Sequence, residues 1–355
     1  MSTTGGTLGE LTKHQLRNLC RVVGIDESDP VRLLGEVLGA ADARPLAQPP
    51  LWPSDVADDA TPAEFSVQVN DTGQRHLRIL AETLPEHPSP TNNLRAARDL
   101  VDSLADRYDL QLDKLRAVAD LFSPDEPQGL FSWWFSFIFD SRGQPKFKVY
   151  FNPNVRGPER AHEVVSEAFE RLGLAEAFLT VGDHALQREQ DRLTFFALDL
   201  DPGPQSRVKL YISQHDATAQ DVMRAAGAVP GISPAQVGDF CKLLAPGTRR
   251  FTGRPLVSSY SLIEGDREKP SNYSIYLPLR DYVPDDSAAR ERVRRHLREH
   301  RIDPVLLDEI IGSLTGRDLS AGAGLLAHVS LRLSPDQTGT TVYASSEAYG
   351  GTPQG

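Results

Sequence analysis

The chain is poor in the residues that carry disulfide, redox and metal chemistry. It has 355 residues but only two cysteines, Cys20 and Cys241, which are too few and too far apart for a disulfide framework or a zinc site. We interpret both as reduced residues of the core. The nine histidines show no ligand spacing, and the pairs Asp58–Asp59 and Asp285–Asp286 lack the spacing of an aspartate-rich magnesium motif. The sequence therefore predicts neither a resident metal ion nor another cofactor.

A surplus of positive charge and a long apolar run are also missing. The formal net charge is −11, which argues against a general nucleic-acid or membrane-surface binder, although a local basic pocket is still allowed. No stretch of about 18 apolar residues could cross a bilayer. Residues 1–6 are small and polar and show no apolar region of a signal peptide. We expect a cytoplasmic protein with no nucleic-acid or membrane partner; the sequence says nothing about oligomeric state.

The common nucleotide and hydrolase motifs are absent as well. The chain has no Gly-x-Gly-x-x-Gly, no phosphate-binding P-loop and no Gly-x-Ser-x-Gly. Dinucleotide enzymes, nucleoside triphosphatases and α/β-hydrolases are therefore not predicted.

What the chain does contain is a tyrosine motif that recurs along its length. A cation or hydroxyl residue followed by a tyrosine two places later occurs four times, about 60–70 residues apart, a period that indicates a repeated structural unit. The copies are Lys148-Val149-Tyr150, Lys209-Leu210-Tyr211, Ser274-Ile275-Tyr276 and Thr341-Val342-Tyr343. Because side chains alternate along a strand, both residues of each motif share one face. Such a face suits a site for a polyanion together with an aromatic or cationic group.

Each motif lies in an apparent β-hairpin, a further hairpin without the motif precedes them, and helical patterns separate the five hairpins. Short turns join the strands, so they must pair antiparallel, which excludes a TIM barrel. Ten such strands could form a sandwich or a closed barrel, and the repetition favours closure with helices outside. Residues 1–60 are expected to form a helical segment and a proline-rich loop packed on the barrel, and residues 61–355 the barrel domain. The predicted strand pairs are 65–69 with 75–80, 131–140 with 146–152, 192–199 with 206–213, 256–264 with 272–279, and 325–333 with 340–345.

Local motifs within this pattern resemble the dimethylallyltryptophan synthase family of indole prenyltransferases. They are Pro62-Ala63-Glu64-Phe65-Ser66, Lys148-Val149-Tyr150-Phe151, Ser206-Arg207-Val208-Lys209-Leu210-Tyr211 and Tyr276-Leu277-Pro278-Leu279-Arg280. The resemblance runs from about residue 60 to the end. It implies the ABBA prenyltransferase (PT) barrel, an α+β fold of five ααββ-type repeats whose ten antiparallel strands form a closed barrel surrounded by helices.

The resemblance also implies an activity and a set of site residues. The activity is metal-independent transfer of a dimethylallyl group from dimethylallyl diphosphate to the indole of L-tryptophan. Arg75, Lys148, Arg207 and Lys209 would hold the diphosphate, since arginine and lysine are the usual partners of phosphate oxygens. The tyrosines Tyr150, Tyr211, Tyr276 and Tyr343 would shield the allyl cation. Glu64 would accept a hydrogen bond from the indole N–H and act as the catalytic carboxylate.

One difference from the family concerns which carbon of the indole ring is prenylated. Members that prenylate indole C4 carry a lysine on the first strand of the second hairpin, but residues 133–139 here read Trp-Trp-Phe-Ser-Phe-Ile-Phe. We therefore expect attack by C5, C6 or C7, with C6 slightly favoured. A cyclic dipeptide, a tyrosine or a polycyclic phenol is an open alternative acceptor. A non-catalytic barrel that binds an anionic or lipid-like ligand is the alternative from another class, and an interaction scaffold is a third.

Overall fold

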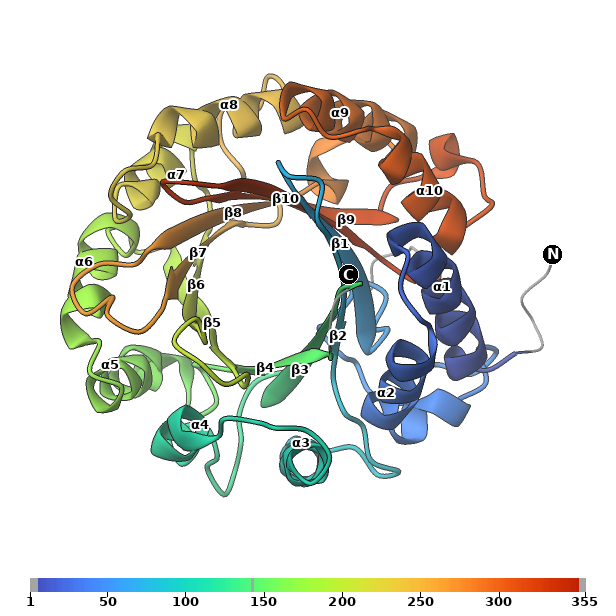
Figure 1. The fold of residues 1–355 in the computed structure, drawn as a ribbon, viewed down its shortest axis with the longest axis horizontal. Coiled ribbons are helices and arrows are strands. Elements are labelled where there is room, and N and C mark those ends of the chain that lie inside the picture. The colour runs from blue at the N-terminus through green and yellow to red at the C-terminus, as the bar shows by residue number, and fades with distance from the viewer. Residues whose placement is uncertain (1–5, 142–143, 351–355) are drawn as a thin grey trace.

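Ten antiparallel strands close into a barrel, because β1 pairs with both β2 and β10. The computed structural model describes residues 6–141 and 144–350. Figure 1 looks down the barrel, and each remaining strand pairs with its neighbours in chain order. The predicted closed barrel is confirmed. The strands are β1 (Ala63–Asn70), β2 (Arg75–Ala81), β3 (Trp133–Phe139), β4 (Lys146–Phe151), β5 (Asp191–Asp199), β6 (Val208–Gln214), β7 (Leu256–Leu262), β8 (Asn272–Pro278), β9 (Leu326–Leu333) and β10 (Thr338–Ala344).

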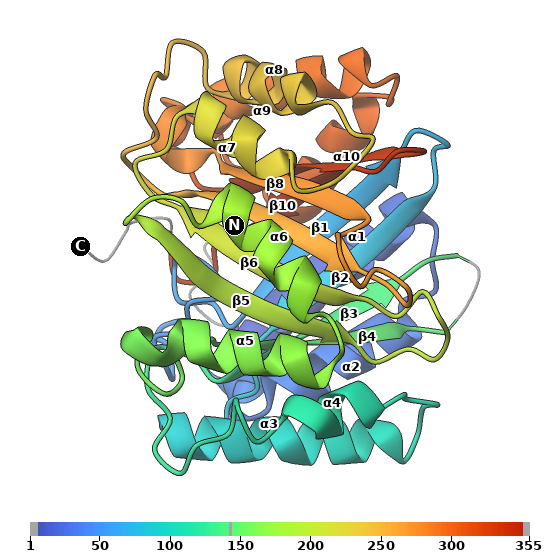
Figure 2. The ribbon, with the colours of Figure 1, turned by 90° about the vertical axis from the view of Figure 1, so that its left-hand side faces the viewer.

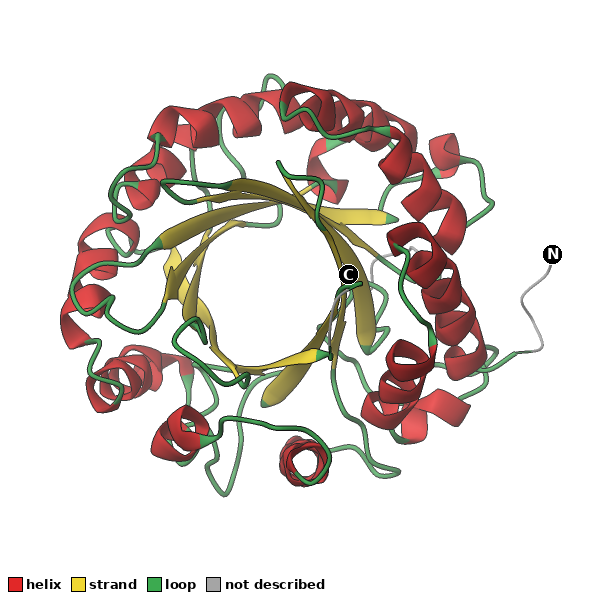
Figure 3. Cartoon of the chain, viewed as in Figure 1, coloured by secondary structure: helices red, strands yellow, loops and turns green. Residues whose placement is uncertain are grey.

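Helices surround the outer face of this barrel (Figure 3). Two precede β1, and two lie between each hairpin and the next, and Figure 2 shows α5, α6 and α7 over the strands on one side of the barrel. In the described part of the chain none is long and apolar enough to cross a membrane. The helices are α1 (Leu8–Val23), α2 (Ser28–Leu38), α3 (Pro90–Ala105), α4 (Asp113–Val118), α5 (Ala161–Arg171), α6 (Ala175–Ala185), α7 (Ala219–Ala226), α8 (Pro234–Leu244), α9 (Asp286–Glu299) and α10 (Val305–Leu314).

The two faces of the barrel wall differ in chemistry. In β1 the odd residues Phe65, Val67 and Val69 join the hydrophobic core between the sheet and the helices. The even residues Gln68 and Asn70 line hollows inside the barrel. Because side chains alternate along a strand, the helices cover the apolar face and leave the polar face to the lumen. The core is therefore a layer around the barrel, and the barrel interior is available for a ligand.

Two helical segments differ from what their sequences indicate. The apolar pattern of residues 92–121 indicates one helix, but the chain forms α3 and α4 with an irregular connection, in which the backbone N–H of Gln111 donates to the carbonyl of Leu200 just after β5. This tertiary contact overrides the helical periodicity. Helix α6 was not predicted, because its alanine-rich sequence, with Gly182 inside it, gives a weak helical pattern.

The segment of residues 51–60, which we call the strap, crosses one end of the barrel. Ser54 Oγ donates a hydrogen bond to Glu82 Oε2 at 2.6 Å, and Asp58 forms ion pairs with Arg254 before β7 and Arg280 after β8. The backbone N–H of Tyr349 donates to Asp59 Oδ2. The strap therefore joins both sides of the barrel at the end where the odd-numbered strands begin.

Candidate active site

The lumen changes in chemistry along the barrel axis. At the end of the hairpin turns, a hollow of about 380 Å³ is lined by polar and charged residues such as His76, Lys146 and Arg332. Deeper inside, cations and tyrosines line a second hollow. At the strap end the lining becomes aromatic, with Trp134 and Phe131 packed on the strap residue Val56. A ligand that spans these layers would meet positive charge at one end and aromatic rings at the other.

Positive side chains from several strands converge in the middle hollow. Three of the four predicted diphosphate residues, Lys148, Arg207 and Lys209, line it from β4, β6 and the turn before β6. Arg78 and Arg332, on β2 and β9, line the same hollow and were missed by the sequence reasoning. Their separation along the chain explains the omission, because only barrel closure brings β2 and β9 near β6.

The prediction is wrong for Arg75. Its guanidinium donates from Nη1 to the backbone carbonyl of Val22 in α1 at 3.0 Å, on the outer face of the barrel. Arg78 lies three residues later in the same strand, so alternation places it on the opposite face. There it lines the lumen and donates to Gln68 Oε1. Arg78, rather than Arg75, is therefore the arginine of β2 that belongs to the lumen cations.

One carboxylate, that of Asp199 at the end of β5, is buried among these cations. Its Oδ1 lies 2.9 Å from Lys148 Nζ, and its Oδ2 accepts from Arg207 Nε at 2.6 Å and from the Arg207 backbone N–H at 3.2 Å. The side chain is only 4% exposed. Strand register explains the contact with Lys148, because β4 and β5 pair these two residues directly. The sequence reasoning did not single out Asp199, although it lies in phase with the lumen positions of its strand.

The pKa values of the buried groups reflect this crowding. Burial raises the pKa of Asp199, but the nearby charges of Lys148 and Arg207 outweigh it, and the net pKa is well below its usual range. Burial lowers the pKa of Lys148 to about 8 despite the attraction of Asp199. Burial, reinforced by Lys148 and Arg207, also lowers the pKa of Lys209 well below its ordinary value. The group holds excess positive charge in a poorly hydrated space, which favours the binding of a polyanion.

The four predicted tyrosines form a continuous arc beside the cations. Ring centroids are 5.7 Å apart for Tyr150 and Tyr211, 5.8 Å for Tyr211 and Tyr276, and 5.8 Å for Tyr276 and Tyr343. Lys209 Nζ lies 4.8 Å from the centroid of the Tyr211 ring. The arc therefore presents aromatic faces and phenol edges directly next to the polyanion site.

Glu64 lies on β1 towards the strap end of the lumen. The residue is 7% exposed, and its carboxylate makes no hydrogen bond to any residue in the described ranges 6–141 and 144–350. Burial, with a smaller contribution from the charge of Asp58, raises the pKa of Glu64 well above its ordinary value. A carboxylate in this state is a strong hydrogen-bond and proton acceptor.

Aromatic side chains face the same region. Phe131 stacks on Trp134 with ring centroids 4.0 Å apart, and Phe195 lies 5.4 Å from Trp134 and 5.7 Å from Tyr211. These rings connect the tyrosine arc to the strap end and form a flat-sided lining suited to a planar aromatic ligand.

A profile of the tryptophan dimethylallyltransferase family matches residues 32–306. The chain belongs to this family. It is 47% identical to the 6-dimethylallyltryptophan synthase from Micromonospora olivasterospora, solved in complex with DMASPP and Trp, with a TM-score of 0.95 over 98% of this chain and 100% of that one. It is 34% identical to the 5-dimethylallyltryptophan synthase from Streptomyces coelicolor, with a TM-score of 0.91 over 97% and 99% of the two chains.

A third similar structure is the prenyltransferase PriB in ternary complex with L-tryptophan and dimethylallyl thiolodiphosphate. It is 36% identical, with a TM-score of 0.89, and the match covers 98% of both chains. Family membership agrees with the resemblance of the sequence motifs, and the ABBA barrel is the fold of this chain.

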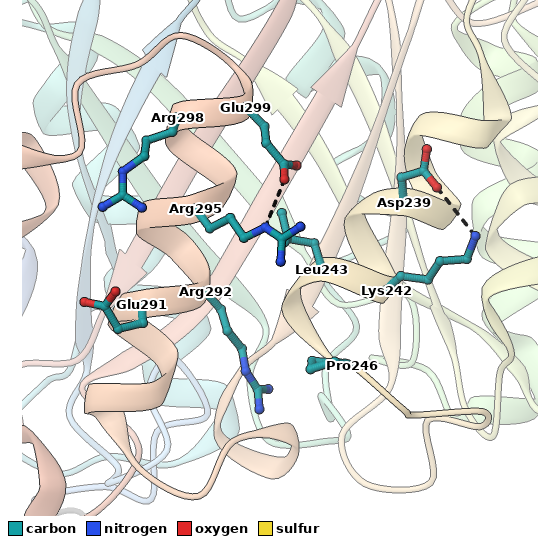
Figure 4. A pocket seen from close by; sticks show the side chains of 9 residues that line it. All are labelled: Asp239, Lys242, Leu243, Pro246, Glu291, Arg292, Arg295, Arg298 and Glu299. Carbon is teal, nitrogen blue, oxygen red and sulfur yellow. Dashed lines mark hydrogen bonds and ion pairs between the residues drawn. The ribbon is translucent and has the colours of Figure 1, made fainter.

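Outside the barrel, a surface hollow of about 690 Å³ lies between α8 and α9 (Figure 4). Its charged groups largely pair with one another, Asp239 with Lys242 at 3.5 Å and Arg295 with Glu299 at 3.1 Å. It contains none of the lumen residues and is not part of the candidate active site. Among the described residues no cluster of three or more histidine, cysteine, aspartate or glutamate side chains could hold a metal ion.

The two arginines of β2 provide a matched test of the cation group. We expect Arg78→Ala to weaken the binding of inorganic diphosphate by about tenfold or more, because one charge-assisted contact is lost. Arg75→Ala should leave the affinity unchanged, since Arg75 faces α1. Isothermal titration calorimetry of both variants checks this. Equal losses in the two variants would contradict the assignment of faces.

The buried carboxylate predicts a pH effect. Asp199 helps to keep Lys148 protonated, so Asp199→Asn should lower the Lys148 pKa below its value of about 8. Lysine loses its charge as pH rises through its pKa, so diphosphate binding should begin to weaken at a lower pH in the variant than in the native protein. Titration calorimetry with inorganic diphosphate across a pH series measures both midpoints. Asp239→Asn serves as the control, because Asp239 lies in the surface hollow outside the barrel. Coincident midpoints for the native protein and Asp199→Asn would refute this role of Asp199.

Proposed function

We propose that this protein transfers a dimethylallyl group from dimethylallyl diphosphate to C6 of the indole ring of L-tryptophan by electrophilic aromatic substitution, without a metal ion. The observation that carries the proposal is the order of groups in one lumen: cations, then the tyrosine arc, then Glu64 with its aromatic surroundings. The relatives described above, which include a 6-dimethylallyltryptophan synthase at 47% identity, support the same reaction.

The cations bind and neutralise the leaving diphosphate. Lys148, Arg207 and Lys209 stand together with Arg78 and Arg332 around the middle hollow. Ionisation of the allylic C–O bond places negative charge on the diphosphate, and these fixed charges stabilise it without reorganisation of solvent. They supply the charge that a magnesium ion supplies in other diphosphate-cleaving enzymes.

The tyrosines act on the other product of that ionisation. The allyl cation forms where the arc of Tyr150, Tyr211, Tyr276 and Tyr343 adjoins the cation group. Aromatic faces stabilise a carbocation through their quadrupoles, and the closed arc keeps water from quenching it. Burial raises the pKa of Tyr211 and Tyr343, so the phenols stay neutral and do not capture the cation as phenolates.

Glu64 orients and activates the acceptor. Its buried carboxylate accepts a hydrogen bond from the indole N–H, and this bond strengthens as the ring becomes positive during attack. The lumen-facing positions of β3, next to β2, are Trp134, Ser136 and Ile138, so this strand offers no lysine to the ring. The absence of this lysine supports attack by C5, C6 or C7, and the 47% identity to a 6-dimethylallyltryptophan synthase favours C6 among them.

Product analysis tests the reaction. Incubation with L-tryptophan and dimethylallyl diphosphate in the presence of EDTA is expected to give a single monoprenylated tryptophan and stoichiometric diphosphate. NMR of the isolated product should show the prenyl group on C6. Diphosphate release without prenylated tryptophan, or no turnover until a divalent metal is added, would count against the proposal.

Substitution of the acceptor carboxylate tests the role of Glu64. Glu64→Gln keeps the size of the side chain but removes its charge, and turnover should fall by about tenfold or more, as expected for a general acid–base group. The KM for dimethylallyl diphosphate should stay unchanged, because Glu64 is not among the residues that line the cation hollow. Glu163→Gln on the exposed face of α5 is the matched control. Native turnover in Glu64→Gln would remove this residue from the mechanism.

A further inference from the structure

Arg207 stands at the junction between an exposed turn and a paired strand. Residues 202–205 of the turn are exposed, and Arg207 directly precedes the first residue of β6. Its side chain lines both hollows of the lumen, and its guanidinium contacts the carboxylate of Asp199. Because turns move more than paired strands do, this guanidinium keeps one position only if the chain beside it is anchored.

The segment around the start of α4, outside the barrel, provides such an anchor. Lys114 Nζ donates a hydrogen bond to the backbone carbonyl of Ser206 at 2.7 Å. Three residues earlier, the backbone N–H of Gln111 donates to the carbonyl of Leu200, also at 2.7 Å. These two contacts hold the chain on both sides of the turn between β5 and β6.

Lys114 reaches the turn from a hollow on the outer face of the barrel. This hollow has a volume of about 750 Å³, and Lys114, Ser206 and Val208 are among the residues that line it. Ser206 also lines the polar hollow inside the barrel. The peptide group that follows Ser206 therefore lies within the barrel wall. Its carbonyl contacts the outer cation, and the next side chain, that of Arg207, enters the lumen.

The N–H of this same peptide group contacts the lumen carboxylate. The carbonyl of Ser206 and the N–H of Arg207 belong to one planar unit. The N–H donates to Asp199 Oδ2 at 3.2 Å, the oxygen that also accepts from Arg207 Nε at 2.6 Å. A rotation of the peptide would break its hydrogen bonds to Lys114 and Asp199 together. The two bonds also strengthen each other, because hydrogen bonds in a chain polarise their shared groups.

The charges on the two sides of this peptide also attract each other. Burial lowers the pKa of Lys114, and the charges of Asp199 and Glu264 offset part of that effect. The ammonium therefore lies within electrostatic range of the lumen carboxylate and is joined to it through the peptide group.

We propose that Lys114 is a positioning residue for the diphosphate site and acts on Arg207 through the peptide that joins Ser206 to Arg207. The ammonium fixes the carbonyl, and the fixed peptide directs its N–H to Asp199. The carboxylate of Asp199 in turn holds the Arg207 guanidinium at the lumen. The inference rests on the proposed function and extends its diphosphate site to a residue on an outer helix.

Diphosphate binding tests this role. Lys114→Met keeps the apolar stem of the side chain but removes the ammonium, and the Kd for inorganic diphosphate should rise by about threefold or more, within the range of couplings between contacting residues. Titration calorimetry measures this change. Lys114→Arg, which retains a cationic donor, should restore most of the affinity. The KM for dimethylallyl diphosphate should rise in Lys114→Met, while the KM for L-tryptophan should change by less than about twofold, which also shows that the variant is folded.

A second substitution separates positioning from a general contribution to stability. If Lys114 acts through Arg207, Lys114→Met should change the Kd by less than about twofold in an Arg207→Met background. Arg156→Met is the matched control. Arg156 likewise donates to backbone carbonyls, those of Leu121 and Asp120, but it lines a different hollow of the outer surface and its loss should leave the Kd unchanged.

Two results would overturn the positioning role. One is an unchanged Kd in Lys114→Met, which would show that water replaces the ammonium without loss. The other is the same fold-change in the native and Arg207→Met backgrounds. If the native protein itself does not bind diphosphate, the proposed function fails together with this inference, whereas binding that is indifferent to Lys114 refutes this inference alone.

Discussion

The burial of several like charges in one lumen is the physical constraint on which this active site depends. Lys148 and Lys209 lie within a space from which water is largely excluded, and burial makes each costly to keep charged there. Asp199 contacts Lys148 and Arg207 directly, which offsets part of the cost for Lys148 and stabilises the charge of Arg207. A further anion of high charge would compensate the remaining positive charge. The lumen is thus suited to a polyanion, and the fold maintains the charge imbalance that favours its binding.

Barrel closure makes this imbalance possible. The cations come from strands that are neighbours only in the closed sheet, and a sandwich would distribute them over two faces. The same closure aligns one tyrosine from each of four strands into an arc with nearly equal ring separations. The motif that repeats along the sequence therefore corresponds to the arc of four tyrosines around the lumen. Because packing of the apolar faces against the helices carries the stability, the lumen faces are available for chemistry.

Much of this arrangement could be predicted from the sequence, and the exceptions have identifiable physical causes. The alternation of apolar and polar residues, together with the turn residues, predicted where the strands lie. The matching position of the tyrosine in each motif predicted that all four tyrosines share one face of the sheet. Arg75 and Arg78 both lie in β2, and the sequence alone did not show which of them faces inward; strand register resolves it. Asp199 gains its role only through the pairing of β5 with β4, and Arg332 gains its role only through barrel closure, which brings β9 near the other strands that carry cations. The break between α3 and α4 likewise depends on a tertiary hydrogen bond from Gln111.

The two ends of the lumen impose different kinds of selection on the two substrates. At the turn end, the hollow that leads to the cations is polar, and in the proposed reaction it admits the diphosphate. At the strap end, Phe131, Trp134 and Phe195 form an aromatic lining to which the acceptor would present a flat ring. Uncompensated buried charge penalises a wrong ligand more than a missing apolar contact does. Selection should therefore be stricter at the cation end, where a ligand must bring negative charge, than at the aromatic end, where shape decides.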